Sequence, residues 1–570
     1  MASLAGWLGT MHTAWGQAQP SSPGAEATEP IQNSNLNGET ALLILLAEMQ
    51  LNRGDFGAAY SMMFEAAKKT NDEGLYKRAV DIALSARNGN LALEAARQWK
   101  KALPISRTAN LHVLQILVAL NQLPESLMPL RAYVQLAPES EQVLLINGLP
   151  QIFAQAKDPE LAAAVVEQAL QPFVDKPLTA AASWTAIGRM QVSAKKPSQA
   201  LASVKKALAR QPDAMEPGFL ALELYAAGIA EAEDLLKTVL TDKSPPHLRL
   251  SYARALIDNQ RIALAKTQLQ SLNQSHPDFA DAWLLMGALT MEQLQYDEAK
   301  SALLRFIEIE KTKEDGRLSQ AYLMLSQIAT KEKKPADAEA WLNKIEDPEA
   351  ATQVQVERAN VLASRGDIAK ARALLAQLPE NTPQAKRVKL QAELKLLRDH
   401  KLFQAAYELL RKAADAEPED LDLRYELAMM AEKINRIDEM EKLLRSVIAE
   451  RPSFEHAYNA LGYALADRNI RLKEARELIV QALDLAPEDP MITDSLGWVE
   501  FRMGNKQSAL AILQRAYETK NDVEIGTHLG EVLWSLGQKD KAIRIWREVA
   551  KQDARNELLQ ETLKRLKVKL

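Results

Sequence analysis

A spacing of about 34 residues between recurring small residues and prolines constrains this chain more than any other feature. The clearest unit has a bulky residue, an aliphatic residue and a glycine, then two alanines and a closing proline: Trp184, Ile187, Gly188, Ala200, Ala207 and Pro212. Later segments keep this register: Trp283, Met286, Gly287 and Ala299; Tyr458, Leu461, Gly462, Ala475, Ala482 and Pro487; Leu496, Gly497, Ala509, Leu513 and Ala516; Leu529, Gly530, Ala542 and Trp546. A glycine inside a helix costs about 1 kcal/mol relative to alanine, so its return at one register indicates that two helices cross closely there.

These positions resemble the tetratricopeptide-repeat pattern, in which two helices form each unit and a proline ends the second helix. Weaker units of the same kind fill other parts of the chain: Ala47, Ala59 and Ala66; Ala253, Ala265 and Pro277; Tyr322, Leu325 and Ala338; Ala406, Ala413 and Pro418. The stretch from Leu75 to Pro172 is helical in pattern but degenerate. We therefore predict an all-α fold, a right-handed superhelical solenoid of about 15 helix pairs over residues 39–555, with a polar capping helix over residues 556–570.

Charge and hydropathy exclude two classes of partner. The chain has 70 Lys and Arg against 75 Asp and Glu, a net charge of −5, which lacks the basic footprint of a nucleic-acid binder. We therefore expect no nucleic-acid partner. The longest apolar run, Ala41 to Ala47, is seven residues, whereas a membrane-spanning helix needs about 18 or more. The chain is thus expected to meet a membrane only through an N-terminal anchor.

Residues 1–38 differ from the rest of the chain. Residues 1–18 are weakly apolar and end in Gly-Gln-Ala, which resembles a signal-peptide cleavage site, and residues 19–38 have the polar, Pro- and Gly-containing composition of a tether. However, the first basic residue is Arg53, so the positive start of a signal peptide is missing. Two explanations stay open: a truncated signal peptide followed by a disordered linker, or an ordinary disordered tail. The chain has no cysteine, so it shows no lipid-modified residue that could serve as an anchor.

No catalytic signature is found in the sequence. It contains no glycine-rich phosphate loop, nucleophile elbow or paired-histidine zinc helix. The seven histidines are far apart in sequence, and none lies within ten residues of another: His12, His112, His247, His276, His400, His456 and His528. We therefore predict that the chain is not an enzyme and that it has no catalytic, cofactor-binding or metal site.

The remaining chemistry is recognition of other proteins. If Trp184 is counted as position 4 of its unit, the tetratricopeptide resemblance places positions 2, 5, 9 and 12 of each unit on its first helix, facing a concave groove. In the last three units these positions are His456, Asn459, Tyr463 and Ala466; Met491, Asp494, Trp498 and Phe501; Glu524, Thr527, Glu531 and Trp534. The predicted binding candidates among them are Asn459, Tyr463, Asp494, Trp498, Phe501 and Trp534. A clamp for a peptide's terminal carboxylate is not predicted, because Ala460 stands where an asparagine would be needed.

The aromatic members of this set have two interpretations. Aromatic residues with polar neighbours are typical of binding hot spots, which favours a stripe of rings in the groove. The same rings can instead pack between adjacent repeats, as core residues. The sequence alone leaves both alternatives open.

One late motif carries a closer resemblance. Residues 492–499 read Ile-Thr-Asp-Ser-Leu-Gly-Trp-Val and residues 501–505 read Phe-Arg-Met-Gly-Asn. Within an array of this length they resemble the LbcA-type proteins, which are tetratricopeptide-repeat outer-membrane lipoproteins. The resemblance implies a periplasmic adaptor that binds a carboxyl-terminal processing protease and brings it cell-wall hydrolases as substrates. It also implies a periplasmic location, with outer-membrane association.

Two other functions stay open from the sequence. One is a structural scaffold of an envelope assembly, such as an exopolysaccharide secretion machine. The other is a cytoplasmic scaffold, which applies if residues 1–38 are only a tail. All three functions are non-catalytic and depend on binding other proteins.

Overall fold

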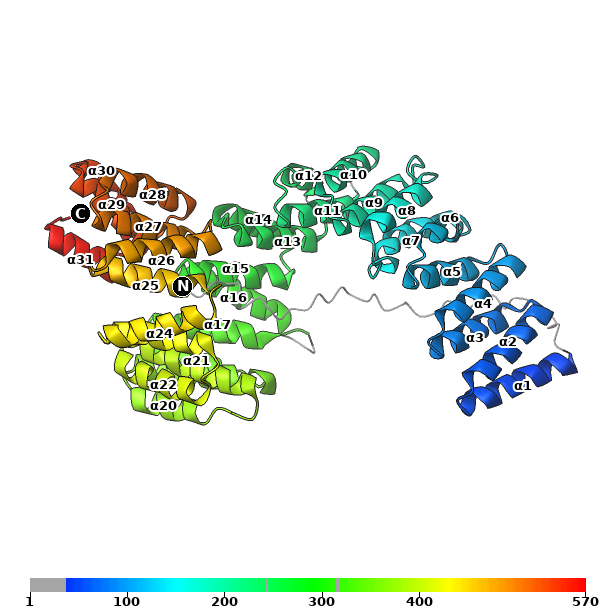
Figure 1. Cartoon of the computed structure of the whole chain (residues 1–570), viewed down its shortest axis with the longest axis horizontal. Coiled ribbons are helices and arrows are strands. Elements are labelled where there is room, and N and C mark those ends of the chain that lie inside the picture. The colour runs from blue at the N-terminus through cyan, green and yellow to red at the C-terminus, as the bar shows by residue number, and fades with distance from the viewer. Residues whose placement is uncertain (1–36, 213, 242–243, 314–316) are drawn as a thin grey trace. The chain divides into compact units, whose positions relative to one another are not determined.

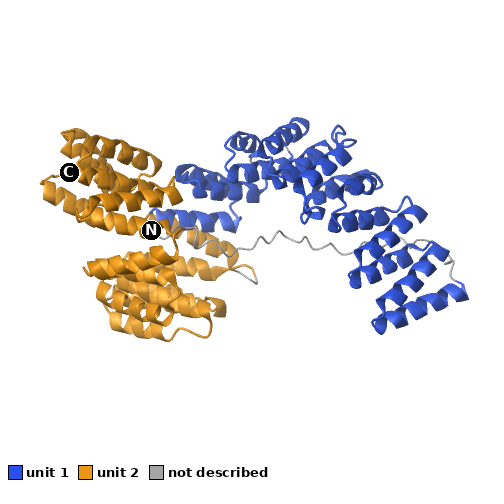
Figure 2. Ribbon diagram, in the orientation of Figure 1, with its two compact units in different colours: residues 1–293 blue, residues 294–570 orange. Residues whose placement is uncertain are grey.

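The computed structural model describes residues 37–212, 214–241, 244–313 and 317–570, which contain 31 α-helices and two short 3-10 helices. No strand occurs in these ranges. The chain divides into two compact units at residues 293 and 294, which are described separately below (Figure 2). The predicted signal and tether segment lies outside the described residues except for Asn37 and Gly38, so its nature stays a prediction.

The first unit contains fifteen α-helices along the chain (Figure 1). Their bounds are α1 Gly38–Asn52, α2 Phe56–Thr70, α3 Glu73–Ser85, α4 Gly89–Ala102, α5 Arg107–Ala119, α6 Leu127–Gln135, α7 Glu139–Ile152, α8 Pro159–Leu170, α9 Ala180–Ser193, α10 Pro197–Arg210, α11 Met215–Ala226, α12 Ala232–Val239, α13 Pro246–Asp258, α14 Ile262–Ser275 and α15 Ala280–Glu292. A short 3-10 helix, η2 Leu123–Ser126, precedes α6.

The second unit contains the remaining sixteen α-helices. Their bounds are α16 Tyr296–Glu310, α17 Leu318–Lys331, α18 Pro335–Leu342, α19 Ala351–Ser364, α20 Ile368–Ala376, α21 Pro383–Asp399, α22 Phe403–Ala416, α23 Leu421–Lys433, α24 Ile437–Glu450, α25 Glu455–Asp467, α26 Leu472–Leu485, α27 Pro490–Arg502, α28 Lys506–Thr519, α29 Val523–Ser535, α30 Lys539–Asp553 and α31 Glu557–Leu566. The second 3-10 helix, η3 Pro348–Ala350, precedes α19.

Taken in chain order, the helices make fifteen pairs and one further helix, and the prediction of an all-α array of helix pairs is confirmed. We call the odd-numbered members up to α29 first helices and the even-numbered members second helices. The prolines at 418, 452 and 487 each stand two residues after the end of a second helix, where the sequence pattern placed the end of a unit. None of the described helices combines the length and the apolar character that crossing a membrane requires.

The register residues lie where each first helix meets its second helix. Ala200 and Ala207 of α10 are fully buried. A Cβ added to Gly188 of α9 would lie 2.6 Å from Cδ2 of Leu220 in α11 and 3.3 Å from the Cβ of Ser203 in α10, so a larger residue would displace Leu220 and crowd α10. The recurring glycine and alanines therefore form the crossing point of the pair, as the sequence predicted.

In every pair except α7–α8, a left-handed residue follows the first helix. Lys195 has φ 56°, its amide donates to the carbonyl of Val192 at 2.8 Å, and the Lys196 amide donates to Gln191 at 2.8 Å. Gly504 follows α27 in the same way with φ 93°, and its amide donates to Phe501 at 3.0 Å. These bonds satisfy the last carbonyls of the first helix and turn the chain into the second helix.

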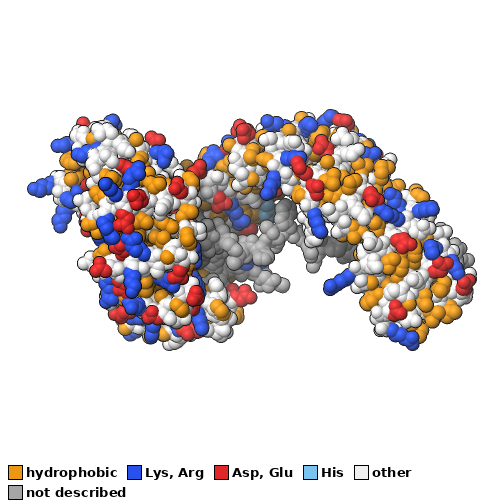
Figure 3. All heavy atoms as spheres, in the orientation of Figure 1, with side chains coloured by type: hydrophobic (Ala, Val, Ile, Leu, Met, Phe, Trp, Pro, Cys, Tyr) orange, Lys and Arg blue, Asp and Glu red, His pale blue; other side chains and the backbone are white. Residues whose placement is uncertain are grey.

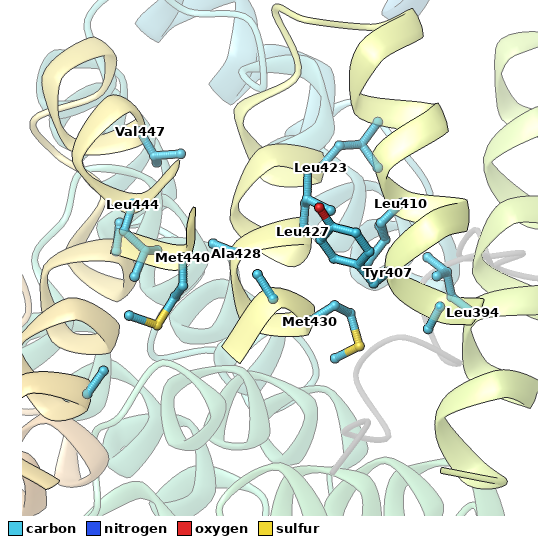
Figure 4. Close-up of a cluster of buried hydrophobic side chains, with 14 of the residues drawn as sticks. Leu394, Tyr407, Leu410, Leu423, Leu427, Ala428, Met430, Met440, Leu444 and Val447 are labelled. Carbon is cyan, nitrogen blue, oxygen red and sulfur yellow. The ribbon is translucent and has the colours of Figure 1, made fainter. Parts of the chain in front are cut away.

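The core is continuous from pair to pair. In the second unit, one apolar cluster runs from Ala359 to Val499 through successive helices. Figure 4 shows part of it, where side chains from α21, α22, α23 and α24 meet: Leu394, Tyr407, Leu410, Leu423, Leu427, Ala428, Met430, Met440, Leu444 and Val447. On the face shown in Figure 3, basic and acidic side chains are interspersed over the surface of both units.

The region predicted to be degenerate is irregular. There α6 is a short helix that η2 precedes, and α7 contains Pro150 in its interior. In addition, α6 packs against α8, and α7 packs against α9. The regular alternation of first and second helices is therefore locally disturbed between α5 and α8.

Candidate protein-binding surface

The predicted binding residues lie on three successive first helices of the second unit, α25, α27 and α29. The starts of α27 and α29 are fixed by aspartate caps. Asp489 accepts hydrogen bonds from the amides of Met491 and Ile492 at 2.7 and 3.0 Å, and Asp522 accepts one from the amide of Glu524 at 2.8 Å. Side-chain caps of this kind satisfy amides that a helix leaves free at its first turn. Because α25 packs against α27, and α27 against α29, their facing side chains are brought together.

A buried histidine and aspartate join α29 to α27. Nδ1 of His528 lies 3.0 and 2.9 Å from the two carboxylate oxygens of Asp494, and both residues are almost completely buried. Burial alone would lower the pKa of His528, but the Asp494 carboxylate outweighs it, so the pKa of His528 is raised above its usual range. The two side chains thus form a hydrogen-bonded pair inside the array, which is an ion pair whenever the imidazole is protonated.

Aromatic rings surround this ion pair. The Trp498 ring stacks on His528 with centroids 4.2 Å apart and planes at 22°, and Phe501 lies 5.4 Å from Trp498. From α25, the Tyr463 hydroxyl lies 3.4 Å from Nε2 of His528, and burial raises the pKa of Tyr463. We call Tyr463, Asp494, Trp498 and His528 the His528 cluster.

The structure bears on the two interpretations of Trp498. Its side chain is 3% exposed and belongs to the apolar cluster that links successive pairs. This is the packing between repeats that the sequence left open as one alternative. The indole Nε1 has no hydrogen-bond partner in the described part of the chain, so the ring is held by packing and stacking. Whether Trp498 contributes to binding stays a prediction.

The other candidates are distributed around this cluster. Asn459 is half-buried on α25, and its Oδ1 has no hydrogen-bond partner among the described residues. Phe501 is half-buried next to Trp498. Trp534 is half-buried in a separate ring pair with Trp546, at 5.8 Å, and Lys539 Nζ lies 5.0 Å from its centroid. The structure therefore brings Tyr463, Asp494, Trp498 and Phe501 together, and Trp534 packs with Phe501 against the next apolar cluster along the chain.

Two residues of this surface were missed by the sequence argument. His528 was noted only as a histidine without a neighbour, although it follows Asp494 by 34 residues, one repeat length. Arg565 of α31 donates to Glu531 of α29 at 2.6 Å, at a position predicted to face the groove. Arg565 likewise follows Glu531 by 34 residues, so comparing charged residues one repeat apart would have found both pairs.

Metal chemistry has no visible basis here. Within the described ranges, no group of three or more His, Asp and Glu side chains is arranged to hold a metal ion. Within the His528 cluster, the Tyr463 hydroxyl, the Asp494 carboxylate and the His528 ring nitrogens contact one another. What the surface offers is a set of half-buried aromatic and amide side chains on neighbouring helices, which suits contact with another polypeptide.

Comparisons with known proteins agree with this architecture. A family profile described as Tetratricopeptide repeat matches residues 352–377, which cover α19 and α20. In fold, the chain is an all-helical tetratricopeptide-repeat array. It is 35% identical over 211 residues to the TPR repeat-containing protein PA4667 of Pseudomonas aeruginosa. This match covers 37% of the chain and 36% of that relative, so the chain matches about a third of the relative's length.

Solved structures are similar at a coarser level. The yeast Tom70 structure is 12% identical with a TM-score of 0.33, covering 92% of this chain and 94% of that chain. A thermophilic TPR protein of Thermus thermophilus is 22% identical with a TM-score of 0.29, covering 31% of this chain and 100% of that chain. Because both TM-scores are low, the helix pairs themselves carry the fold assignment. A tetratricopeptide-repeat fold is typically a scaffold for protein–protein interaction.

Proposed function

We propose that this chain is a non-catalytic scaffold that binds other proteins and acts as an adaptor in the cell envelope. The observation that carries the proposal is the array itself: the described helices form a succession of pairs followed by one further helix, and no other kind of domain occurs in the described ranges. Solenoids of this kind present long surfaces on which a partner chain can lie. The half-buried Asn459, Tyr463, Phe501 and Trp534 supply the amide and aromatic groups such a surface uses.

The partners we propose are a periplasmic carboxyl-terminal processing protease and the cell-wall hydrolases that it degrades. The resemblance of residues 492–505 to the LbcA-type proteins supports this assignment. An adaptor with two kinds of partner needs a long surface, and an array with two compact units offers room for both. The scaffold would raise the local concentration of substrate near the protease without taking part in the chemistry.

The location we propose is the periplasm, with association to the outer membrane. Support comes from the same resemblance and from the Gly-Gln-Ala sequence at residues 16–18. Fractionation of cells, with the intact mass of the recovered chain, tests it. A chain found in the cytoplasm with residues 1–18 still attached would contradict the envelope location and favour a cytoplasmic scaffold.

The decisive experiment combines the purified chain with a purified protease of this class from the same cell. We expect a complex on size-exclusion chromatography and faster degradation of a hydrolase substrate when the chain is present. The protease alone and the chain alone are the controls. No complex, or degradation at the same rate with and without the chain, would reject the adaptor function.

A matched pair of variants tests whether the predicted surface is used. Asn459→Ala removes a half-buried amide whose Oδ1 has no partner among the described residues, so it should weaken partner binding while the melting temperature holds. Gln481→Ala, at an exposed position of the second helix α26, should leave both unchanged. Equal partner affinities for the two variants would show that Asn459 is not part of the binding surface.

A further inference from the structure

The last helix of the chain continues the row of first helices, but no second helix follows it among the described residues. Each first helix packs on the pair before it: α27 against α26 and α25, and α29 against α28 and α27. α31 packs in the same way on α29, the first helix of the last pair, but barely on α30. It thus lies on the side of the second unit formed by the first helices, which we call the first-helix face (Figure 1).

An apolar ridge fastens α31 to α29. Leu559, Thr562 and Leu563 are buried, and Leu559 and Leu563 join an apolar cluster with Val523 and Leu529 of α29. Their spacing places them on one side of the helix. The opposite side is exposed and charged, with Glu561 and Lys564 among its residues. α31 is therefore an amphipathic helix seated by its apolar side.

Polar contacts show how far α31 reaches across this face. Arg565 pairs with Glu531 at 2.6 Å, and the Asp467 carboxylate at the end of α25 contributes to the raised pKa of Arg565, after Glu531. At the other end of α31, Glu557 pairs with Lys401, which stands in the turn after α21. The helix thus spans from the end of α21, past α25, to α29.

The occupied positions include the predicted groove. Glu531 stands at groove position 9 of α29, and its side chain is only 7% exposed because α31 covers it. If α31 moved away, this carboxylate would lose its cation. A group that replaces α31 must therefore bring a basic side chain to the same place.

The hold on α31 is nevertheless light. The helix has ten residues, which is too short to be stable alone in water. The Lys401–Glu557 pair is about two-thirds exposed on both sides, and exposed ion pairs contribute little. Terminal elements with few buried side chains open more readily than the rest of a protein.

We propose that α31 is a removable occupant of the first-helix face, and that the same face binds an amphipathic helix of a partner protein. The partner helix would carry a Leu- and Thr-type ridge, a basic side chain for Glu531 and an acidic one for Lys401. The inference rests on the proposed scaffold function and deepens it, because it names the kind of element that the scaffold takes. α31 then competes with the partner and keeps the face covered until the partner arrives.

The test uses the chain's own helix as the probe, so it requires no identified partner. A fluorescent peptide of residues 554–570 is titrated into the full-length chain and into a full-length variant with Leu559→Asp and Leu563→Asp, in which α31 cannot seat. We expect the variant to bind the peptide at least about tenfold more tightly than the parent chain. Circular dichroism and melting of the variant show whether the array is intact.

A charge reversal locates the site. Adding Glu531→Lys to the variant should weaken peptide binding at least about tenfold, and a peptide with Arg565→Glu should restore it. Arg565→Glu in the otherwise unchanged chain leaves the apolar ridge in place and provides a second route to an uncovered face, because Arg565 is 54% exposed and its replacement leaves no cavity; the melting temperature of this variant shows whether the array is intact. This single variant should bind the peptide more tightly than the parent.

Three results would overturn the proposal. One is a folded double variant that fails to bind the peptide, and another is equal binding to parent and variant, which places the peptide elsewhere. The third is hydrogen exchange in which the α31 amides open only with the whole array, because the helix is then a fixed part of the fold. Failure of the protease to bind would reject the adaptor function and leave these three measurements unaffected.

Discussion

The last three helix pairs and the region from α5 to α8 both contain helical glycines, but they use them differently. A Cβ added to Gly462 of α25 would lie 2.9 Å from the carbonyl oxygen of Ala475, and one added to Gly497 of α27 would lie 2.5 Å from Leu513. A Cβ added to Gly148 of α7 would meet nothing within 4 Å. Gly462 and Gly497, in the repeat register, therefore mark close crossings, whereas Gly148 does not.

The difference extends to the packing around these residues. In the last pairs, each first helix packs on its second helix and on the next first helix, and the His528 cluster forms between them. Between α5 and α8 this changes, since α7 packs on the next first helix, α9, but barely on its own second helix, α8, while α6 packs on α8. Close crossing is thus what lets side chains of successive pairs reach one another and form buried contacts.

The largest effect is expected where the regular region is most tightly packed. Trp498→Ala removes a ring that is 3% exposed and stacked on His528, which should cost about 3–5 kcal/mol of stability. Leu144→Ala in the irregular region removes a side chain that is 73% exposed and should cost almost nothing. Urea unfolding and hydrogen exchange of α25, α27 and α29 measure the difference.

The same Trp498 variant also separates packing from binding. If the ring is core, the melting temperature falls, and partner affinity changes only through the loss of structure. Unchanged stability with weakened partner binding would show that the ring contacts the partner, which would contradict the buried position of Trp498.

The second effect tests the crossing itself. Gly462→Val places a branched side chain against the backbone of α26, and overpacking of this kind costs about 1–3 kcal/mol. Gly148→Val is the matched control, because it carries the same change of helix propensity into open space. Equal losses of stability at the two sites would mean that the close crossing of α25 and α26 does not contribute to the free energy of unfolding.

The fold could be predicted because its determinants are local in sequence. Gly, Ala and Pro recur at fixed offsets, and each has a direct steric reason. The pair α19–α20 was not singled out, although the family profile matches it. Ala359 and Ala371, both fully buried, lie at the crossing of this pair. Ala359 stands at the position that glycine takes in the clearest units. Because alanine has the highest helix propensity and is expected anywhere in a helix, Ala359 did not mark the repeat in the sequence.

The candidate surface was harder to predict for a physical reason. A fixed register says which side of a helix a residue is on, but not how closely the next first helix approaches. Asp494 and Trp498 were predicted as groove candidates, with packing between repeats left open for the Trp498 ring, and the structure buries both against His528 of α29. The contact depends on a position 34 residues away, and Glu531 is likewise paired with Arg565 of α31, 34 residues further along the chain.

The third effect depends on pH and distinguishes the two regions within one molecule. The raised pKa of His528 means that the Asp494–His528 pair contributes stability in full below the unfolded pKa of about 6.5. That contribution is lost as the pH rises through the raised folded pKa. The other groups facing His528 are Glu524, Glu531 and the Tyr463 hydroxyl.

We expect this effect to be smaller than the first two, because both side chains stay in place. Hydrogen exchange should show α27 and α29 opening more easily above neutral pH, with α5 to α8 as the internal reference after correction for intrinsic exchange. His528→Gln should abolish the difference. A chain in which α27 and α29 become more protected at higher pH would contradict the charged pair.

The smallest effect is a gain in stability in the irregular region. Gly148 is in the helical interior of α7, where glycine costs about 0.5–1 kcal/mol relative to alanine through the freedom of the unfolded chain. Because an added Cβ meets nothing within 4 Å, Gly148→Ala should recover that amount without a packing penalty. Hydrogen exchange of α7 and thermal melting measure the gain.

At Gly462 the same change to alanine should destabilise the chain, since the added Cβ meets the backbone of α26. If Gly148→Ala also destabilised the chain, α7 would have to approach a neighbour as closely as α25 does, and the contrast between the two regions would fail.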